Sequence, residues 1–215
     1  MQATAGPKTV TRGSRTFTEN ARRAQIVEAA IQTIAELGFG RASFAQIAKR
    51  AGLSSTGLIS YHFANKDEVI TQVVTETHAA LGQFVGQRVQ AQTTAAGMLR
   101  AYITAVVDFI ASNGVQMQAL LQIFLNFRPT SAGRSNDATT GQMVVSDVER
   151  ILRHGQDGGE FRQFDTLVMA VTIQRAVDGL PFLLETRSDT DLGSYARELV
   201  TLFDLATRRV QVPGT

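Results

Sequence analysis

The spacing of apolar residues is the feature that most constrains the fold of this chain. Ile26, Ala30, Ile34 and Leu37 follow one another at intervals of four, four and three residues, which places them on one face of an α-helix. The same spacing recurs further along, in Ile70, Val74, Thr77, Leu81 and Val85. No segment alternates apolar and polar residues for long enough to form a sheet. The sequence therefore predicts an all-α fold.

Capping residues and glycines mark the first two helices. The first helix begins at Thr18 or Asn20, either of which can cap it, and ends at Gly38, because glycine adopts the left-handed conformation that terminates helices. The second helix is short and covers residues 44–51, with Ser43 directly ahead of it. Two helices of this kind leave a small apolar face that a further helix must cover.

A turn at Gly52 leads into the third helix. Ser54 and Ser55 can each cap this helix, and Ile59 and Phe63 give it an inward-facing pair. A short helix, a turn and a second short helix form a helix-turn-helix, whose second helix lies in the major groove of DNA.

A long fourth helix follows, capped by Asn65 and opening at Lys66, and we expect it to end before Gly86. Further helices are expected at 97–112, 114–127, 139–154, 165–187 with a kink at Pro181, and 191–209. A loop over 128–137 and a turn over 155–164 separate three of them.

The charge of the chain is distributed unevenly. Residues 1–66 hold nine basic and three acidic side chains, a net charge of +6, whereas residues 67–215 carry a net charge of −4. Such an asymmetry arises by chance in some proteins, but it also suits a chain with one end that meets a polyanion.

The outward residues of the third helix indicate what that polyanion is. They are small or polar hydrogen-bonding residues without a carboxylate: Ser55, Thr56, Gly57, Ser60, Tyr61 and His62. A helix of this composition can approach phosphates and base edges without repulsion. The alternative is that these residues form an ordinary solvated surface.

Three segments together resemble the DNA-binding domain of TetR-family transcriptional regulators. They are AELGF (35–39), SFAQIAKRAGLS (43–54) and YHFANKDEV (61–69). The resemblance implies an all-α homodimer with an N-terminal three-helix module that binds operator DNA. It also implies a larger C-terminal helical domain that binds a small-molecule inducer and forms the dimer interface.

The resemblance also implies roles for individual residues. Ser43 matches a hydroxyl that contacts phosphate, Gln46 can face the groove, and Lys66 matches a lysine that reaches a backbone phosphate. The interval from Gly52 to Phe63 is one residue longer than is usual in the family. The expected DNA-contacting set is Ser43, Gln46, Ser55, Thr56, Gly57, Ser60, Tyr61, His62 and Lys66, with Tyr61 replacing an aromatic that often stands at the position of Ser60.

The predicted organisation has three parts: a flexible basic arm over 1–17, the helix-turn-helix domain over 18–66 within a family module of about 20–80, and the ligand-binding and dimerisation domain over 67–215. Four arginines precede or open the first helix: Arg12, Arg15, Arg22 and Arg23. Such an arm enters a minor groove in some helix-turn-helix proteins and merely solvates the terminus in others.

The C-terminal part offers candidates for a ligand pocket and a dimer face. The ligand candidates are Tyr102, Phe109, Gln122, Asn126, Arg175 and Asp178. The competing interpretations are core packing for the aromatics, an exposed polar stripe for the amides, and an interhelical salt bridge or a dimer contact for Arg175 and Asp178. The last two helices carry apolar residues on more than one side, so we expect them to pair with a second copy as a four-helix bundle.

Other classes of protein find less support. The three histidines lack metal-ligand spacing, and the chain contains no phosphate loop, no Gly-x-Ser-x-Gly elbow and no cysteine. No apolar run appears long enough to span a bilayer. We therefore expect a cytoplasmic, non-enzymatic regulator without cofactor or metal, which a small-molecule effector releases from its operator. The alternative is a helical ligand-binding or enzymatic protein without sequence-specific DNA binding.

Overall fold

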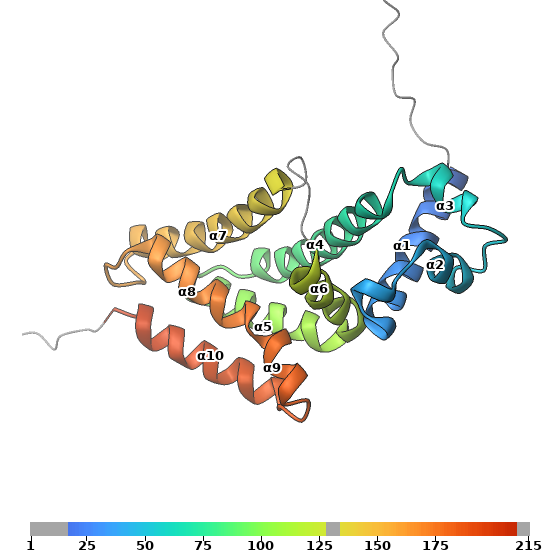
Figure 1. Cartoon of the computed structure of the whole chain (residues 1–215). Helices are drawn as coiled ribbons and strands as arrows, with labels where there is room; N and C mark the ends of the chain where they lie inside the picture. Colours follow the sequence, from blue (N-terminus) through green and yellow to red (C-terminus); the bar gives the residue numbers. More distant parts are fainter. Residues whose placement is uncertain (1–16, 128–133, 210–215) are drawn as a thin grey trace, which may run out of the picture.

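The structure is a computed structural model that describes residues 17–127 and 134–209. Within these residues the chain forms helices and turns, with a single β-bridge between Phe161 and Arg208 and no strand, so the predicted all-α fold is confirmed (Figure 1). In order, the elements are α1 (Phe17–Leu37), the 3-10 helix η1 (Phe39–Arg41), α2 (Phe44–Arg50), α3 (Gly57–His62), α4 (Lys66–Gln90), α5 (Ala95–Ser112), α6 (Gly114–Asn126), α7 (Arg134–Asp157), α8 (Thr166–Asp178), α9 (Leu180–Thr186) and α10 (Leu192–Thr207).

Two apolar cores organise the molecule. The N-terminal core is built from α1 to α4 and also receives Ala119 and Ile123 of α6. The C-terminal core is built around α5, which packs against α4, α7 and α10. Helix α4 therefore belongs to both cores and connects them, with Ile70 in the first and Val85 in the second. Figure 1 shows α1 to α3 at one end of the molecule and α7 to α10 at the other.

The ends of two early helices differ from prediction. Helix α1 begins at Phe17, so Thr18 and Asn20 lie inside its first turn and do not cap it. It ends before Gly38, whose φ of +81° is a positive angle that glycine adopts readily, but whose ψ of 158° lies outside the left-handed helical region expected there. Helix α4 continues through Gly86 to Gln90, because a single glycine costs a helix only about 1 kcal/mol.

The later helices also differ in their bounds. The predicted helix over 165–187 is two helices, α8 and α9, which meet at Gly179. Pro181 lies in the first turn of α9, where the missing N–H would have had no helical partner, so it starts a helix rather than kinking one. Helix α7 begins at Arg134, inside the predicted loop of 128–137; the rest of that loop lies outside the described residues.

Two segments have the length and mean hydropathy of a membrane span, contrary to the expectation that none would. They are Ala95–Ser112 and Thr166–Thr186. The first is α5, the central helix of the C-terminal core, and half of its residues are buried. The second is interrupted at Gly179 and leaves apolar side chains at the surface. Core helices commonly reach this length and hydropathy.

Candidate DNA-binding surface

The first half of the helix-turn-helix is α2, which is held at its start by a side chain. The hydroxyl oxygen of Ser43 accepts a hydrogen bond from the backbone N–H of Gln46 at 3.3 Å and so caps the helix. Ile47 and Ala48 are buried against α1. The turn that follows contains Gly52 with φ +65°, a conformation that side chains other than glycine rarely adopt. Helix α2 and its turn are therefore set by local chemistry.

The recognition helix, α3, is shorter than predicted. It begins at Gly57, and its N-cap residue Thr56 makes no side-chain cap, so the expectation that Ser54 or Ser55 caps it is wrong. Ile59 and Phe63 are fully buried, as predicted. Because these two residues keep the i, i+4 spacing of one helical face, the additional residue in this interval lies before Ile59 and leaves the inward face of α3 unchanged.

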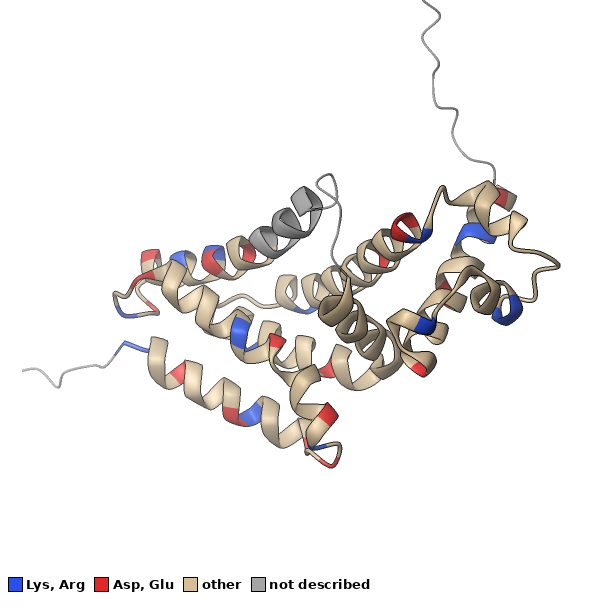
Figure 2. Cartoon of the chain, viewed as in Figure 1, with Lys and Arg blue, Asp and Glu red and all other residues tan. Residues whose placement is uncertain are grey.

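Most of the predicted DNA-contacting side chains lie at the surface. Ser43, Gln46, Ser55, Thr56, Gly57, Ser60 and Tyr61 are exposed, and His62 is half-buried. Tyr61 is 74% exposed, and its ring meets the imidazole of His62 edge-on at a centroid distance of 5.0 Å. No Asp or Glu occurs between Glu36 and Asp67. Figure 2 accordingly shows no acidic residue on α2 or α3, and basic residues on α2.

Lys66 at the head of α4 is held more tightly than the sequence suggests. Its ammonium group donates to the carbonyl of Phe39 at 2.8 Å and lies 4.4 Å from the centroid of the Phe39 ring. Burial lowers the pKa of Lys66, and the neighbouring charge of Asp67 opposes this shift. An ammonium group has three donors, so the bond to Phe39 leaves two for a phosphate.

The two arginines that open the first helix differ in their surroundings. Arg22 is exposed and donates to Gln25 at 2.7 Å. Arg23 is buried among α1, α3 and α4, so it is not available to extend a basic surface toward DNA. Arg12 and Arg15, and almost all of the predicted arm, lie outside the described residues.

Comparisons with known proteins bear on this surface directly. The sequence model described as "Bacterial regulatory proteins, tetR family" matches residues 26–73, which span α1 to the first part of α4. The BetI transcriptional regulator of Stenotrophomonas maltophilia is 32% identical over 146 residues, covering 64% of this chain and 72% of the relative. The chain belongs to the TetR family. The BetI regulator of Cronobacter sakazakii is 27% identical over 188 residues, covering 85% of this chain and 88% of that one.

Solved structures show that most of the chain has the fold of this family. The regulator AibR, in complex with isovaleryl coenzyme A and operator DNA, superposes with a TM-score of 0.73 and 17% identity, covering 84% of this chain and 97% of that one. A putative regulator from Saccharomonospora viridis, in complex with choline, superposes with a TM-score of 0.75 and 18% identity, covering 89% of this chain and all of that one. The present protein is therefore a TetR-family regulator with a helix-turn-helix domain and a helical C-terminal domain.

Three polar side chains of the C-terminal domain form a connected group in this TetR-family regulator. The hydroxyl of Tyr102 on α5 donates to Gln174 on α8 at 2.5 Å, and the amide of Gln174 donates to Asp178 at 2.6 Å. Burial and the carboxylates of Asp178 and Asp147 raise the pKa of Tyr102. Burial also raises the pKa of Asp178, against the hydrogen bond from Gln174 and the charge of Arg175. The sequence singled out Tyr102 and Asp178 as ligand candidates, but not the two bonds through Gln174 that join them.

The other ligand candidates lie elsewhere in the C-terminal domain. Phe109 is buried and packs edge-on against Phe84 at 5.5 Å. The amide of Asn126 donates to the backbone of Gln122, and the side chain of Gln122 approaches Gly38 in the DNA-binding module. Arg175 forms an exposed ion pair with Asp178 at 3.5 Å, but both residues lie on α8, so this pair is not the interhelical salt bridge that the sequence left open. The structure thus joins Tyr102 with Asp178 but places Gln122 at the junction with the module.

One hollow opens on the surface of the C-terminal domain, with a volume of about 440 Å³. Its lining comes from a single face of α7: Ser146, Glu149, Arg150, Arg153, His154 and Asp157. Glu149 accepts from Arg153, and this bond lowers the pKa of the carboxyl. None of the predicted ligand residues lines the hollow. Within the described residues, no group of three or more His, Asp or Glu side chains could hold a metal ion.

Sequence reasoning missed two structural features of the candidate DNA-binding surface. Leu58 is an apolar side chain on the outer side of α3 and is 39% exposed. Phe39 binds Lys66 through both its carbonyl and its ring. Leu58 could have been found from its position next to the inward-facing Ile59, since neighbours on a helix point in different directions. The bond to Phe39 has no local signal in the sequence.

Proposed function

We propose that this TetR-family regulator binds a two-fold operator as a homodimer and represses transcription until a small-molecule effector releases it. The observation that carries the proposal is the surface of α2 and α3, where exposed hydroxyl, amide and phenol groups occur without a carboxylate. A duplex presents phosphates around its grooves and donors and acceptors within the major groove. The hydroxyl, amide and phenol groups of this surface can bond to the phosphates and to the base edges alike.

Each expected contact has a physical role on this surface. The hydroxyl of Ser43 accepts from Gln46, so its own proton remains to be donated to a phosphate. Tyr61 and Lys66 supply a phenol and an ammonium for the backbone. Gln46 and Ser60 are placed to meet base edges, with Ser55, Thr56, Gly57 and His62 around them. The apolar tip of Leu58 suits a thymine methyl group.

Apolar side chains on α8 and α10 support the homodimer. Their exposed residues are Leu167, Val168, Val171, Leu202 and Leu205. The two helices are tied by a hydrogen bond of 3.1 Å from the hydroxyl of Tyr195 to the carbonyl of Ala176. Exposed apolar surface of this kind usually contacts a partner. A two-fold dimer presents two recognition helices, which can meet half-sites about 34–36 Å apart or a multiple of that distance.

The polar group formed by Tyr102, Gln174 and Asp178 is the proposed anchor of the effector. It lies beside an apolar core, so it suits a small organic molecule with an apolar body and a polar or cationic end. Phe109 and Arg175 are candidates for further contacts, while Gln122 and Asn126 are candidates at the junction with the module. Structurally similar regulators bind isovaleryl coenzyme A or choline. The protein would act in the cytoplasm without a cofactor.

The proposed mechanism of release runs through α4, which belongs to both cores. An effector that binds more tightly when α4 is tilted shifts the population toward dimers with tilted α4 helices. In those dimers the distance between the two recognition helices no longer matches the distance between the operator half-sites. Coupling of this kind typically corresponds to about 1–3 kcal/mol between the two sites.

The test is a salt titration of DNA binding. The purified chain selects duplexes from a random-sequence pool, and affinity for the selected duplex is then measured at increasing salt. We expect a steep linear fall of log affinity with log salt, because phosphate contacts release counterions. Tyr61→Ala and Lys66→Ala should each weaken binding, and Lys66→Ala should also lower the slope by about one unit. A chain that selects no duplex, or variants that bind as the wild type does, would overturn the proposal.

A further inference from the structure

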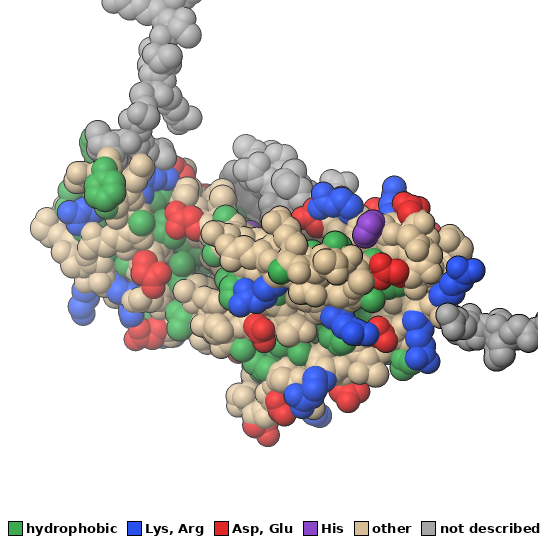
Figure 3. Space-filling model, turned by 180° about the vertical axis from the view of Figure 1, so that it is seen from behind, with side chains coloured by type: hydrophobic (Ala, Val, Ile, Leu, Met, Phe, Trp, Pro, Cys, Tyr) green, Lys and Arg blue, Asp and Glu red, His purple; other side chains and the backbone are tan. Residues whose placement is uncertain are grey.

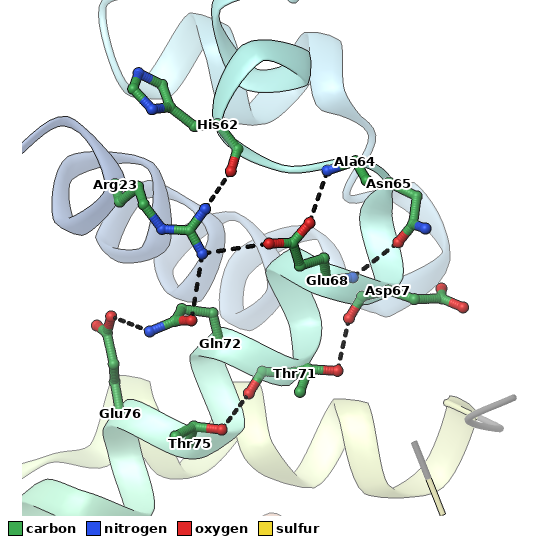
Figure 4. Close-up of polar contacts among 10 residues, drawn as sticks. All are labelled: Arg23, His62, Ala64, Asn65, Asp67, Glu68, Thr71, Gln72, Thr75 and Glu76. Carbon is green, nitrogen blue, oxygen red and sulfur yellow. Dashed lines mark hydrogen bonds and ion pairs between the residues drawn. The ribbon is translucent and has the colours of Figure 1, made fainter. Parts of the chain in front are cut away.

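A buried arginine lies at the point where α1, α3 and α4 meet. Arg23 of α1 is 6% exposed. One terminal nitrogen of its guanidinium donates to the backbone carbonyl of His62, the last residue of α3. The other lies 3.4 Å from both Glu68 and Gln72, which are one turn apart on α4. Figure 4 shows these contacts radiating from the single guanidinium group.

The surroundings of Arg23 fix its position. The guanidinium carbon lies 3.8 Å from the centroid of the Phe63 ring, which is itself fully buried. The second oxygen of Glu68 accepts from the backbone N–H of Ala64 at 2.8 Å, so the residues between α3 and α4 are held by the same carboxylate. Asn65 caps α4 by accepting from the N–H of Glu68 at 2.9 Å. The end of α3 and the start of α4 therefore share one bonded cluster, shown in Figure 4.

The chemistry of the contact explains why an arginine stands here. The last carbonyls of a helix have no partner within that helix, so the carbonyl of His62 needs an outside donor. A guanidinium group is planar and carries several donors in a fixed fork, so it bonds one helix on each side at the same time. Glu68 balances its charge at 3.4 Å. A lysine ammonium is a compact charge that cannot reproduce this fork.

We propose that Arg23 is a positioning residue, which fixes the orientation of the recognition helix on α4 through the carbonyl of His62. Arg23 is too buried to touch DNA, so its effect on binding passes through α3. A displacement of α4 then carries α3 with it, because both are bonded to the same guanidinium. This inference rests on the proposed function in its DNA-binding step and adds the residue that connects α4 to the reading surface.

The experiment compares Arg23→Lys with Arg22→Lys, a matched control on the neighbouring exposed arginine. Two quantities are measured on the full chain: hydrogen exchange of the segment 57–63, and affinity for a duplex selected from random sequences by the wild type and for a scrambled duplex of equal length. Arg23→Lys should accelerate exchange in 57–63. It should also weaken binding of the selected duplex by about ten- to a hundredfold, the range expected for a lost hydrogen bond to a charged group.

The two duplexes separate positioning from other roles. Binding of the scrambled duplex, and the slope of affinity against salt, should stay at wild-type values in Arg23→Lys, because no phosphate contact is removed. A merely destabilised protein would instead lose both affinities in proportion to its inactive fraction. Arg22→Lys should leave the exchange of 57–63 unchanged.

A second variant guards against misfolding. If Arg23→Lys fails to fold, Glu68→Gln is measured instead, which removes the charge of the more exposed member of the Arg23–Glu68 pair. Exchange in 57–63 should again accelerate and affinity for the selected duplex should again fall, but both by less than in Arg23→Lys. Wild-type exchange in 57–63 together with wild-type affinity for the selected duplex, in a folded variant, would overturn the inference. If the wild-type chain selects no duplex, the proposed function fails, and exchange in 57–63 still decides whether Arg23 holds α3.

Discussion

The two ends of this regulator differ in how many large apolar side chains they expose to solvent. In the DNA-binding module the large apolar side chains Ile26, Ile47 and Phe63 are fully buried, and the outer surface is mostly small and polar. In the C-terminal domain Val168 is 62% exposed and Leu205 is 53% exposed. Figure 3 shows apolar side chains reaching the surface over the C-terminal half among charged ones. The module is thus closed within one chain, whereas the proposed dimer would complete the C-terminal domain.

The strongest test of a closed module is the removal of its central side chain. Phe63→Ala should lower the free energy of unfolding by about 3–5 kcal/mol, because the change leaves a cavity beneath Arg23. Denaturant unfolding followed by circular dichroism measures the loss. Leu58→Ala, on the exposed side of the same helix, should change stability by less than about 0.5 kcal/mol. Equal effects for both variants would break the comparison.

The complementary test introduces charge among the exposed apolar side chains of α8 and α10. The double variant Val168→Asp, Leu205→Asp should convert the dimer to a monomer, because each carboxylate would lose its water at the interface. Sedimentation equilibrium measures the mass, and affinity for the selected duplex should fall by about a hundredfold or more as one half-site is lost. Val115→Asp on α6 is the control, since Val115 is also exposed but lies outside the α8–α10 face. A double variant that remains dimeric would place the interface elsewhere.

A smaller effect is expected at the cap of α2. Ser43→Ala should lower the free energy of unfolding by about 1 kcal/mol, because the N–H of Gln46 loses its acceptor. Ser60→Ala, on the outer surface of α3, should stay within about 0.5 kcal/mol. Urea unfolding of both variants checks the difference. An equal loss would mean that the cap does not contribute to the stability of the closed module.

The smallest effect concerns the polar group formed by Tyr102, Gln174 and Asp178 in the C-terminal domain. Because the folded chain raises the pKa of Asp178, it binds that proton more tightly than the unfolded chain does, so stability falls as pH rises from the unfolded pKa through the folded one. Asp178→Asn retains an acceptor for Gln174 and removes this dependence. At neutral pH the free energy of unfolding of Asp178→Asn should exceed that of the wild type by less than about 1 kcal/mol. The difference is small because the Asp178 side chain is 42% exposed, and water screens its charge. Thermal unfolding from pH 3 to 7 tests this; a steeper pH dependence in the variant would contradict it.

The local features of the fold were predictable from the sequence. Asn65 caps α4 as expected, and Ser43, which stands directly ahead of α2, caps that helix in the same way. Each bond joins residues only three positions apart. The start of α3 was not predictable in the same way, since Ser54, Ser55 and Thr56 are all suitable caps and the helix uses none of their side chains. The break between α8 and α9 was misplaced by two residues, at Pro181 rather than Gly179.

Contacts between distant residues account for the remaining errors. Arg23 looked like one more surface charge, but its partners His62, Glu68 and Gln72 are 39 to 49 positions away in the sequence. Likewise, the hydrogen bond between Tyr102 and Gln174 spans 72 positions. A periodic pattern shows which face of a helix is inward, but it does not show which partner it will meet.

The contribution of α6 to the N-terminal core has a consequence for engineering. Ala119 and Ile123 are buried among residues of α1 to α4, and the rings of Phe39 and Phe127 lie 5.9 Å apart. A fragment that stops after α4 would open this core to water. A chimeric regulator built from the DNA-binding module of this chain must therefore include α6 as well as α1 to α4. More than twenty residues, among them α5, separate α6 from the end of α4 in the chain.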